Sequence, residues 1–384
     1  MRRRAQGKTA KPSRDAFSLL ALCSLAVLAI TSAASAQTAA TAATAAATAT
    51  SGSQTAAQKF RPQIVGADTS FLRQLEQRGV LFKDNGAAEP GLKILKDHGY
   101  NLIRLRLFVD PDTLPNNLAY TIASAKDAKS LGLKLLLDLH YADDWADPAH
   151  QPTPKAWRKL AHAELVSAVF AYTRDTIGAF RAAGVMPDMV QVGNEVSSGM
   201  LWPDGQLPDH WDRFAALISA GIQGIDAGRR DAPRPRIMIH IDQGGNEETT
   251  KWFFDNLLSR GVNFDVIGQS YYPWWQGSLK DLSLNLGFMA RTYKKDIIVV
   301  ETAYDWKTGE DFKGRKPPFP QTPDGQRDYL RALEKTIVDS PGGRCLGVFW
   351  WEPMAEGPIE KRALFDEEHN ALPAITVFDG NTVP

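Results

Sequence analysis

The strings VGNE (residues 192–195) and VVETAY (residues 299–304) decide the fold, because each places a glutamate directly after a short apolar run. Short, largely β-branched runs bounded by glycine or loop residues are typical of buried parallel strands. In a barrel of parallel strands, side chains at the carboxyl ends of the strands converge on one rim, where the active sites of that architecture lie. We therefore expect Glu195 and Glu301 to meet at such a rim.

Two carboxyls brought together at a rim can split a glycosidic bond between them. One is ionised and attacks the sugar, while the other is protonated and donates to the leaving oxygen. For either glutamate alone, a salt bridge at the barrel rim is an equally good interpretation. Asn194 before the first glutamate, and the matching position of the second, favour catalysis.

Composition and length place few limits on the function. The chain has 384 residues, a formal net charge of +0 and 43% hydrophobic residues, which is ample for a full core. Because there is no basic excess, we expect no nucleic-acid partner. The 10 tryptophans either fill the core or stack on sugar faces, and their number does not decide between these roles.

The N-terminus has the pattern of a targeting segment. Three arginines at 2–4 precede an apolar stretch at 18–30 that is short for a membrane span, and an A-x-A site ends at Ala36. We predict a signal peptide at 1–36, hence a secreted or periplasmic protein with no stable membrane anchor after cleavage. An uncleaved anchor is the alternative. Residues 37–58, rich in alanine and threonine, are predicted to be a flexible linker rather than a helix.

Residues 59–384 are predicted to form one catalytic domain in which strands and helices alternate. The expected strands are Ile64–Ala67, Leu102–Leu105, Leu133–Leu139, Met189–Val192, Arg236–His240, Val266–Ser270, Ile297–Val300 and Cys345–Trp350. The expected helices are Gly91–His98, Ile122–Leu131, Ala161–Ala183, Trp211–Asp226, Thr249–Leu258, Leu279–Tyr293 and Gln326–Val338. This α/β pattern predicts a (β/α)8 TIM barrel.

A doubly wound open sheet is the competing fold. It normally carries a glycine-rich phosphate-binding turn after its first strand, and GADTS at 66–70 is not that motif. Two long segments, Tyr141–Trp157 and Thr302–Pro323, follow predicted strand ends. We expect both on the catalytic rim. Cys345 is the only cysteine after the predicted cleavage site, so no disulfide forms within the mature chain, and a buried inert thiol is expected.

Polar or aromatic side chains stand at nearly every predicted strand end. They are Asp68, Arg104, Arg106, Asp138, His140, Asn194, Glu195, His240, Asp242, Ser270, Tyr271, Tyr272, Glu301 and Trp350. Arg104 is expected either to keep the attacking carboxylate ionised or to pair with a core carboxylate. The D-x-H and H-x-D pairs at His140 and His240 are possible metal ligands. A metal-dependent barrel hydrolase would want paired histidines on its first strand, so we expect no metal and no cofactor.

Aromatic side chains cluster near the same strand ends. Trp274 or Trp275 is the candidate for stacking on an outer sugar. Trp350 and Trp351 point to opposite faces of a strand, so only one of them can reach the site. Packing beneath loops is the interpretation for Trp157 and Trp351.

With these residues in view, the chain resembles family 53 of the glycoside hydrolases, the endo-β-1,4-galactanases, over about residues 63–378. The resemblance lies in GADTS (66–70), NLIRLR (101–106), LDLHYAD (137–143), WADP (145–148), QVGNE (191–195), LWP (201–203), VET (300–302) and WEP (351–353). The strings HYADDWADP and VGNEVSSGMLWP are the most specific to that family.

The resemblance implies Glu195 as acid/base, Glu301 as nucleophile and Asn194 as the residue that binds the sugar 2-hydroxyl. It also implies that Arg104, His140, His240, Tyr272 and Trp350 line the cleavage subsite; Asp68, at the first strand end, is added to the substrate-binding set. Some bacterial members carry calcium in the loop after the seventh strand, but residues 305–322 lack the closely spaced ligands, so we do not expect it here.

The expected function is retaining endo-hydrolysis of β-1,4-galactosidic linkages in pectic galactan or type I arabinogalactan. The expected partner is therefore a polysaccharide, and we expect a monomer. A clan relative acting on mannan or cellulose is the nearest alternative. A non-enzymatic carbohydrate-binding barrel and a metal-dependent hydrolase are two further classes. The first is disfavoured because a binding module has no need for both glutamates.

Overall fold

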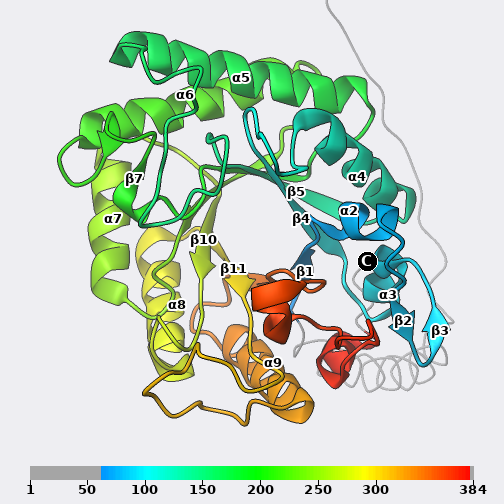
Figure 1. Cartoon of the computed structure of the whole chain (residues 1–384). Coiled ribbons are helices and arrows are strands. Elements are labelled where there is room, and N and C mark those ends of the chain that lie inside the picture. Colours follow the sequence, from blue (N-terminus) through cyan, green and yellow to red (C-terminus); the bar gives the residue numbers. More distant parts are fainter. Residues whose placement is uncertain (1–61, 381–384) are drawn as a thin grey trace, which may run out of the picture. The chain divides into compact units, whose positions relative to one another are not determined.

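Eight parallel strands close into a barrel in the computed structural model, which describes residues 62–380 (Figure 1). Around the barrel they follow chain order, and the last strand lies beside the first. The strands are β1 (Ile64–Asp68), β4 (Leu102–Leu107), β5 (Lys134–Leu139), β6 (Met189–Val192), β9 (Arg236–Ile241), β10 (Val266–Ser270), β11 (Asp296–Thr302) and β12 (Cys345–Trp350). The predicted (β/α)8 fold is confirmed. The predicted signal peptide and linker lie outside the described residues.

Helices connect successive strands and surround the barrel (Figure 1). They are α2 (Leu72–Gln77), α3 (Gly91–Asp97), α4 (Leu118–Ser130), α5 (His162–Ala182), α6 (Trp211–Arg229), α7 (Glu247–Ser259), α8 (Leu279–Tyr293) and α9 (Pro323–Val338). Side chains of Asn117, Asn246, Ser278 and Thr322 accept hydrogen bonds from the first turns of α4, α7, α8 and α9. Such caps satisfy backbone donors that a helix start leaves unpaired. The short α2 was not predicted.

Smaller elements lie within the loops. They are the hairpins β2 (Lys83–Asp84) with β3 (Ala87–Ala88) and β7 (Gly199–Met200) with β8 (Gly205–Gln206), and the 3-10 helices η2 (Val196–Ser198), η3 (Gly357–Arg362) and η4 (Pro373–Phe378). No helix among residues 62–380 has the length and apolarity needed to cross a membrane.

Apolar side chains are buried in two clusters. The larger one joins the strands to the surrounding helices. The smaller one consists of strand residues alone and fills the barrel interior: Leu102, Leu136, Met189, Met238, Val266, Ile298, Val300 and Phe349. Residues two positions further along a strand point to the same face. This alternation carries Leu102 to Arg104 and Met238 to His240, so that polar side chains stand above the inner core.

Strand β11 carries an extra residue next to Glu301. Gln269 of β10 pairs with Val299, but Ser270 pairs with Glu301, and the register with β12 shifts at the same place. Val300 already points into the barrel, so strict alternation would turn Glu301 outward. A β-bulge re-aims the side chain that follows it. It thereby allows Glu301 to face the barrel rim.

Candidate active site

A cavity of about 220 Å³ opens at the carboxyl ends of the strands. It is lined by Arg104, Arg106, His140, Trp145, Ala146, Asp147, Asn194, Glu195, Tyr272, Trp275, Glu301, Trp351 and Arg362. A second hollow of about 740 Å³ shares Asp147, Glu195 and Trp275 with it, and continues toward Asp242 and Glu247. Both glutamates therefore reach one cavity, and Glu195 stands where it meets the larger hollow. The long 141–157 segment contributes to both, as expected for a rim loop.

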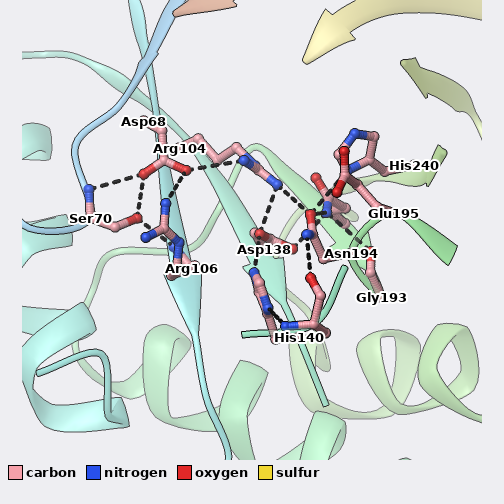
Figure 2. A network of polar contacts seen from close by, with 12 residues as sticks. Asp68, Ser70, Arg104, Arg106, Asp138, His140, Gly193, Asn194, Glu195 and His240 are labelled. Carbon is pink, nitrogen blue, oxygen red and sulfur yellow. Dashed lines mark hydrogen bonds and ion pairs between the residues drawn. The ribbon is translucent and has the colours of Figure 1, made fainter. Parts of the chain in front are cut away.

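Arg104 is the centre of the buried polar network (Figure 2). Its Nη1 donates to Asp68 at 3.0 Å and to Glu301 at 2.6 Å, and its Nη2 donates to Asp138 at 2.8 Å and to Asn194 at 2.7 Å. The side chain is 1% exposed. A buried cation of this kind is stable only when carboxylates surround it. Because the guanidinium bonds residues of four strands or strand ends, it fixes their relative positions.

Glu301 is held at both carboxyl oxygens. Arg104 bonds Oε1, and the Tyr272 hydroxyl donates to Oε2 at 3.1 Å. Burial raises the pKa of Glu301 above its ordinary value, and the nearby Arg104 cation opposes that rise. The arrangement orients the carboxylate and supplies it with a counter-ion.

Glu195 sits in a different environment. Its backbone is left-handed, with φ of 46°, and Gly193 just before it has φ of 81°. A non-glycine residue in this region is uncommon, and such strain gathers at functional sites. Burial raises the pKa of Glu195 well above its ordinary value, and the neighbouring Glu301 and Asp242 carboxyls raise it further. Its Oε1 lies 2.6 Å from Ser270 Oγ.

The two histidines are fully engaged in hydrogen bonds. His140 Nδ1 accepts from the Ala146 amide at 3.2 Å, and its Nε2 lies 3.0 Å from Asp138. His240 bonds Asn194 and Ser270 through its two ring nitrogens. Among residues 62–380, no group of three or more His, Cys, Asp or Glu side chains could hold a metal ion.

A second buried arginine supports the first. Arg106 contacts Asp68 at 3.1 Å and donates to Glu352 at 2.6 Å, and its guanidinium lies 4.2 Å from the Trp145 ring centre. Burial, opposed by Arg106, raises the pKa of Glu352 to about 7. Burial also acts on Asp68, but Arg106 and Arg104 outweigh it and lower the pKa of that carboxyl. Asp68 therefore stays ionised between the two guanidinium groups.

Several residues predicted to bind substrate do line the cavity. They are Arg104, His140, Asn194, Tyr272 and Trp275, together with the two glutamates. Trp275 is 61% exposed.

The structure corrects the placement of three predicted tryptophans. Trp350 is 1% exposed, packs in the outer cluster and donates its indole N–H to the Arg362 carbonyl, whereas Trp351 lines the cavity. Strand alternation explains this, because Phe349 points inward and Trp351 shares its face. Trp274 is 0% exposed and packs beneath Tyr272 and against Phe312.

Asp68 and His240, which were predicted to bind substrate, do not line the cavity. Both lie behind it, 1% and 0% exposed, and bond the residues that do line it. The sequence predicted that both residues lie at strand ends. It contains no pattern that shows how deep in the barrel their side chains lie.

Arg362 is one of the cavity residues that sequence reasoning missed. It is bonded at both Nε and Nη2 to Asp311 at 2.8 Å, and its guanidinium lies 4.9 Å from the Trp274 ring centre. It comes from η3, beyond the last strand, where no pattern marked a functional position. Trp351 would have been predicted to line the cavity if the residues on the inward face of β12 had been known.

The site places its two carboxyls, Glu195 and Glu301, in different chemical environments. One bonds an arginine and a tyrosine hydroxyl, and the other is partly buried near two carboxyls that oppose its ionisation. Pushing two pKa values apart in this way assigns one group as an acid and the other as a base or nucleophile. Such a pair, in a cavity lined by tryptophans, suits cleavage of a sugar polymer.

Known proteins that are similar to this chain include glycoside hydrolases of one family. The sequence model described as "Glycosyl hydrolase family 53" matches residues 64–378. An uncharacterized protein of Niallia circulans is 43% identical over 76% of this chain and 83% of its own. An arabinogalactan endo-beta-1,4-galactanase of Humicola insolens is 35% identical over 82% of this chain and 98% of its own. The solved GH53 catalytic domain of Ignisphaera aggregans superposes with a TM-score of 0.77 at 34% identity, covering 82% of this chain and 95% of that one.

Proposed function

This chain belongs to glycosyl hydrolase family 53, and on that premise we propose that it is an endo-hydrolase of β-1,4-galactosidic linkages in pectic galactan and type I arabinogalactan. The relative from Humicola insolens carries the name of this activity. The observation that carries the proposal is the pair of unlike carboxyls, Glu195 and Glu301, at one cavity. A binding module would need neither.

The proposed reaction has two displacements and retains the anomeric configuration. In the first, the Glu301 carboxylate attacks the anomeric carbon and forms a galactosyl ester. At the same time, Glu195 gives its proton to the glycosidic oxygen, and the C–O bond to the leaving chain breaks. In the second, Glu195 takes a proton from water, which attacks the same carbon and releases Glu301.

Neighbouring groups support each role. Arg104 and Tyr272 both bond the Glu301 carboxylate, which orients its free lone pairs and favours its charge. Asn194 Nδ2 donates one hydrogen to the Ala146 carbonyl at 2.8 Å, and its second hydrogen is available to the sugar 2-hydroxyl. A contact at this hydroxyl that strengthens in the transition state lowers the barrier.

Substrate choice is tested by release of reducing ends. We expect the purified enzyme to hydrolyse linear β-1,4-galactan and to act at least about tenfold more slowly on mannan and cellulose, because the axial 4-hydroxyl of galactose bends its chain. Glu301→Gln serves as the matched inactive control. Comparable rates on mannan or cellulose would overturn the galactan assignment. They would leave the two-glutamate mechanism in place. A loss of activity with a chelator would instead favour the metal-dependent class.

We propose export as well, from the signal-peptide pattern at 1–36. The expected mature N-terminus is Gln37, in a protein recovered from the periplasm or medium, where we expect it to be a monomer. N-terminal sequencing and light scattering test these points. An intact N-terminus on exported protein would contradict the cleavage.

A further inference from the structure

Glu195 stands at one end of a buried chain of hydrogen-bonding groups. Its Oε1 lies 2.6 Å from Ser270 Oγ, which lies 2.8 Å from His240 Nε2. His240 Nδ1 lies 3.1 Å from Asn194 Oδ1. Ser270 and His240 are each 0% exposed, so bulk water does not complete their bonding. Figure 2 shows Glu195, Asn194 and His240 at the end of the arginine network.

The direction of each hydrogen bond follows from the Asn194 end. Arg104 carries only donors and bonds Asn194 Oδ1 at 2.7 Å, which identifies that atom as the amide oxygen. An amide oxygen cannot donate, so His240 Nδ1 must carry a hydrogen to bond it. A neutral imidazole has one N–H, and its other nitrogen accepts. His240 Nε2 is then the acceptor, and Ser270 donates its single hydroxyl hydrogen to it.

An ionised Glu195 would accept the hydrogen of Ser270, but with that hydrogen directed to His240, Ser270 can only accept from a protonated Glu195. We propose that Ser270 and His240 form a relay that holds the catalytic proton on Glu195 Oε1, with Glu195 donating to Ser270, Ser270 to His240 Nε2, and His240 Nδ1–H to Asn194. The roles of Ser270 and His240 are positioning roles, and their effect on rate rests on the proposed function of Glu195.

Loss of the proton breaks one bond in this chain. When Glu195 gives its proton to the leaving oxygen, Ser270 must turn its hydrogen to the new carboxylate, and His240 Nε2 loses its donor. A buried acceptor without a donor is unfavourable. The relay therefore favours the protonated acid before cleavage and its reprotonation by water afterwards.

One competing arrangement keeps the same number of protons. If His240 carried the proton as an imidazolium, it would donate at both nitrogens and Ser270 would donate to an ionised Glu195. Burial lowers the pKa of His240 well below its ordinary value, and Arg104 and His140 lower it further. The groups facing Glu195 are Asp242 after β9, Glu301 on β11, Arg104 on β4 and Tyr272 after β10.

Removing the serine hydroxyl shifts the basic limb of the pH profile. The direction of the shift depends on whether Ser270 accepts a hydrogen bond from Glu195 or donates one to it. In the relay, Ser270→Ala deprives the protonated acid of its acceptor. The basic limb of the kcat/KM profile then moves down by about 0.5–1 pH unit. If Ser270 instead donates to the carboxylate, the same variant moves that limb upward. Ser270→Thr keeps the hydroxyl and should retain the wild-type limb. Thr302→Val removes a buried hydroxyl that bonds Tyr271 and Tyr329 instead, and should not move it.

Nitrogen NMR of the resting enzyme tests the relay without reference to any substrate. The chain has 7 histidines, and His240→Asn identifies the resonances of His240 by their loss. The relay predicts a neutral ring with hydrogen at Nδ1 alone. Hydrogen at Nε2 alone, or at both nitrogens, would overturn it. Since galactan is not involved, failure of this test is separate from failure of the proposed hydrolase activity.

Discussion

At the scale of single residues, the surroundings shift the pKa values of the two glutamates by different amounts. The carboxyls of Glu301 and Asp242 oppose the ionisation of Glu195 and Arg104 offsets them only in part, whereas Glu301 bonds Arg104 directly. The same low-dielectric surroundings therefore hold a proton on one group and keep a counter-ion on the other. Two predictions at this scale separate their roles.

The first prediction concerns the leaving group. Glu301→Ala should abolish turnover of every substrate, because nothing else forms the ester. Glu195→Ala should lower the rate on galactan by about 10²–10⁴-fold and the rate on an activated aryl galactoside far less, since a good leaving group needs little protonation. Steady-state kinetics on both substrates measures this. Equal losses on the two would show that Glu195 is not the acid.

The second prediction concerns pH. The pKa values of both glutamates are raised, that of Glu195 well above the ordinary value, so activity should fall below the pKa of Glu301 and above that of Glu195. Protonation removes the nucleophile on the acid side, and deprotonation removes the acid on the basic side. Glu195→Gln, assayed with an activated substrate, should lose the basic limb and keep the acid limb. A basic limb that survives contradicts the assignment.

At the scale of elements, strand alternation points two neighbouring tryptophans to opposite faces, where they have different roles. Trp351 lines the cavity and Trp350 fills the outer core. We predict that Trp351→Ala weakens galactan binding by roughly 1–3 kcal/mol, seen mainly in KM, with little change in Tm. Trp350→Ala should instead lower the free energy of unfolding by about 3–5 kcal/mol. Kinetics and denaturant melts of the pair decide this, and a reversed pattern would mean that the inward face of β12 is misassigned.

The strands were well predicted because each is a short apolar run with a clear boundary. Met189–Val192, Val266–Ser270 and Cys345–Trp350 have the predicted bounds. The face that each side chain takes was harder to predict. The bulge in β11 reverses the alternation before Glu301, and no residue in that strand predicts a bulge. The positions of Trp351 and Arg362 depend on register and on a segment beyond the barrel, which only the folded chain defines.

At the scale of the whole molecule, the rim offers a site that continues past the catalytic pair. The hollow of about 740 Å³ begins at Glu195, the group that protonates the leaving oxygen, so the leaving part of the chain has room there. We predict cleavage at internal linkages, with early loss of viscosity and a mixture of oligosaccharides. Size analysis of products at low conversion measures this. A single short product released from the first minutes would indicate action at chain ends instead.

The proposed mechanism requires that Glu301 form the covalent bond to galactose. Its most direct test is mass spectrometry of the enzyme after reaction with a 2-fluoro galactosyl reagent that carries a good leaving group, followed by peptide mapping. Such a reagent lets the ester form but slows its hydrolysis. One added glycosyl mass is expected on the peptide that contains Glu301. A label on Glu195, or on the buried Glu352, would contradict this mechanism.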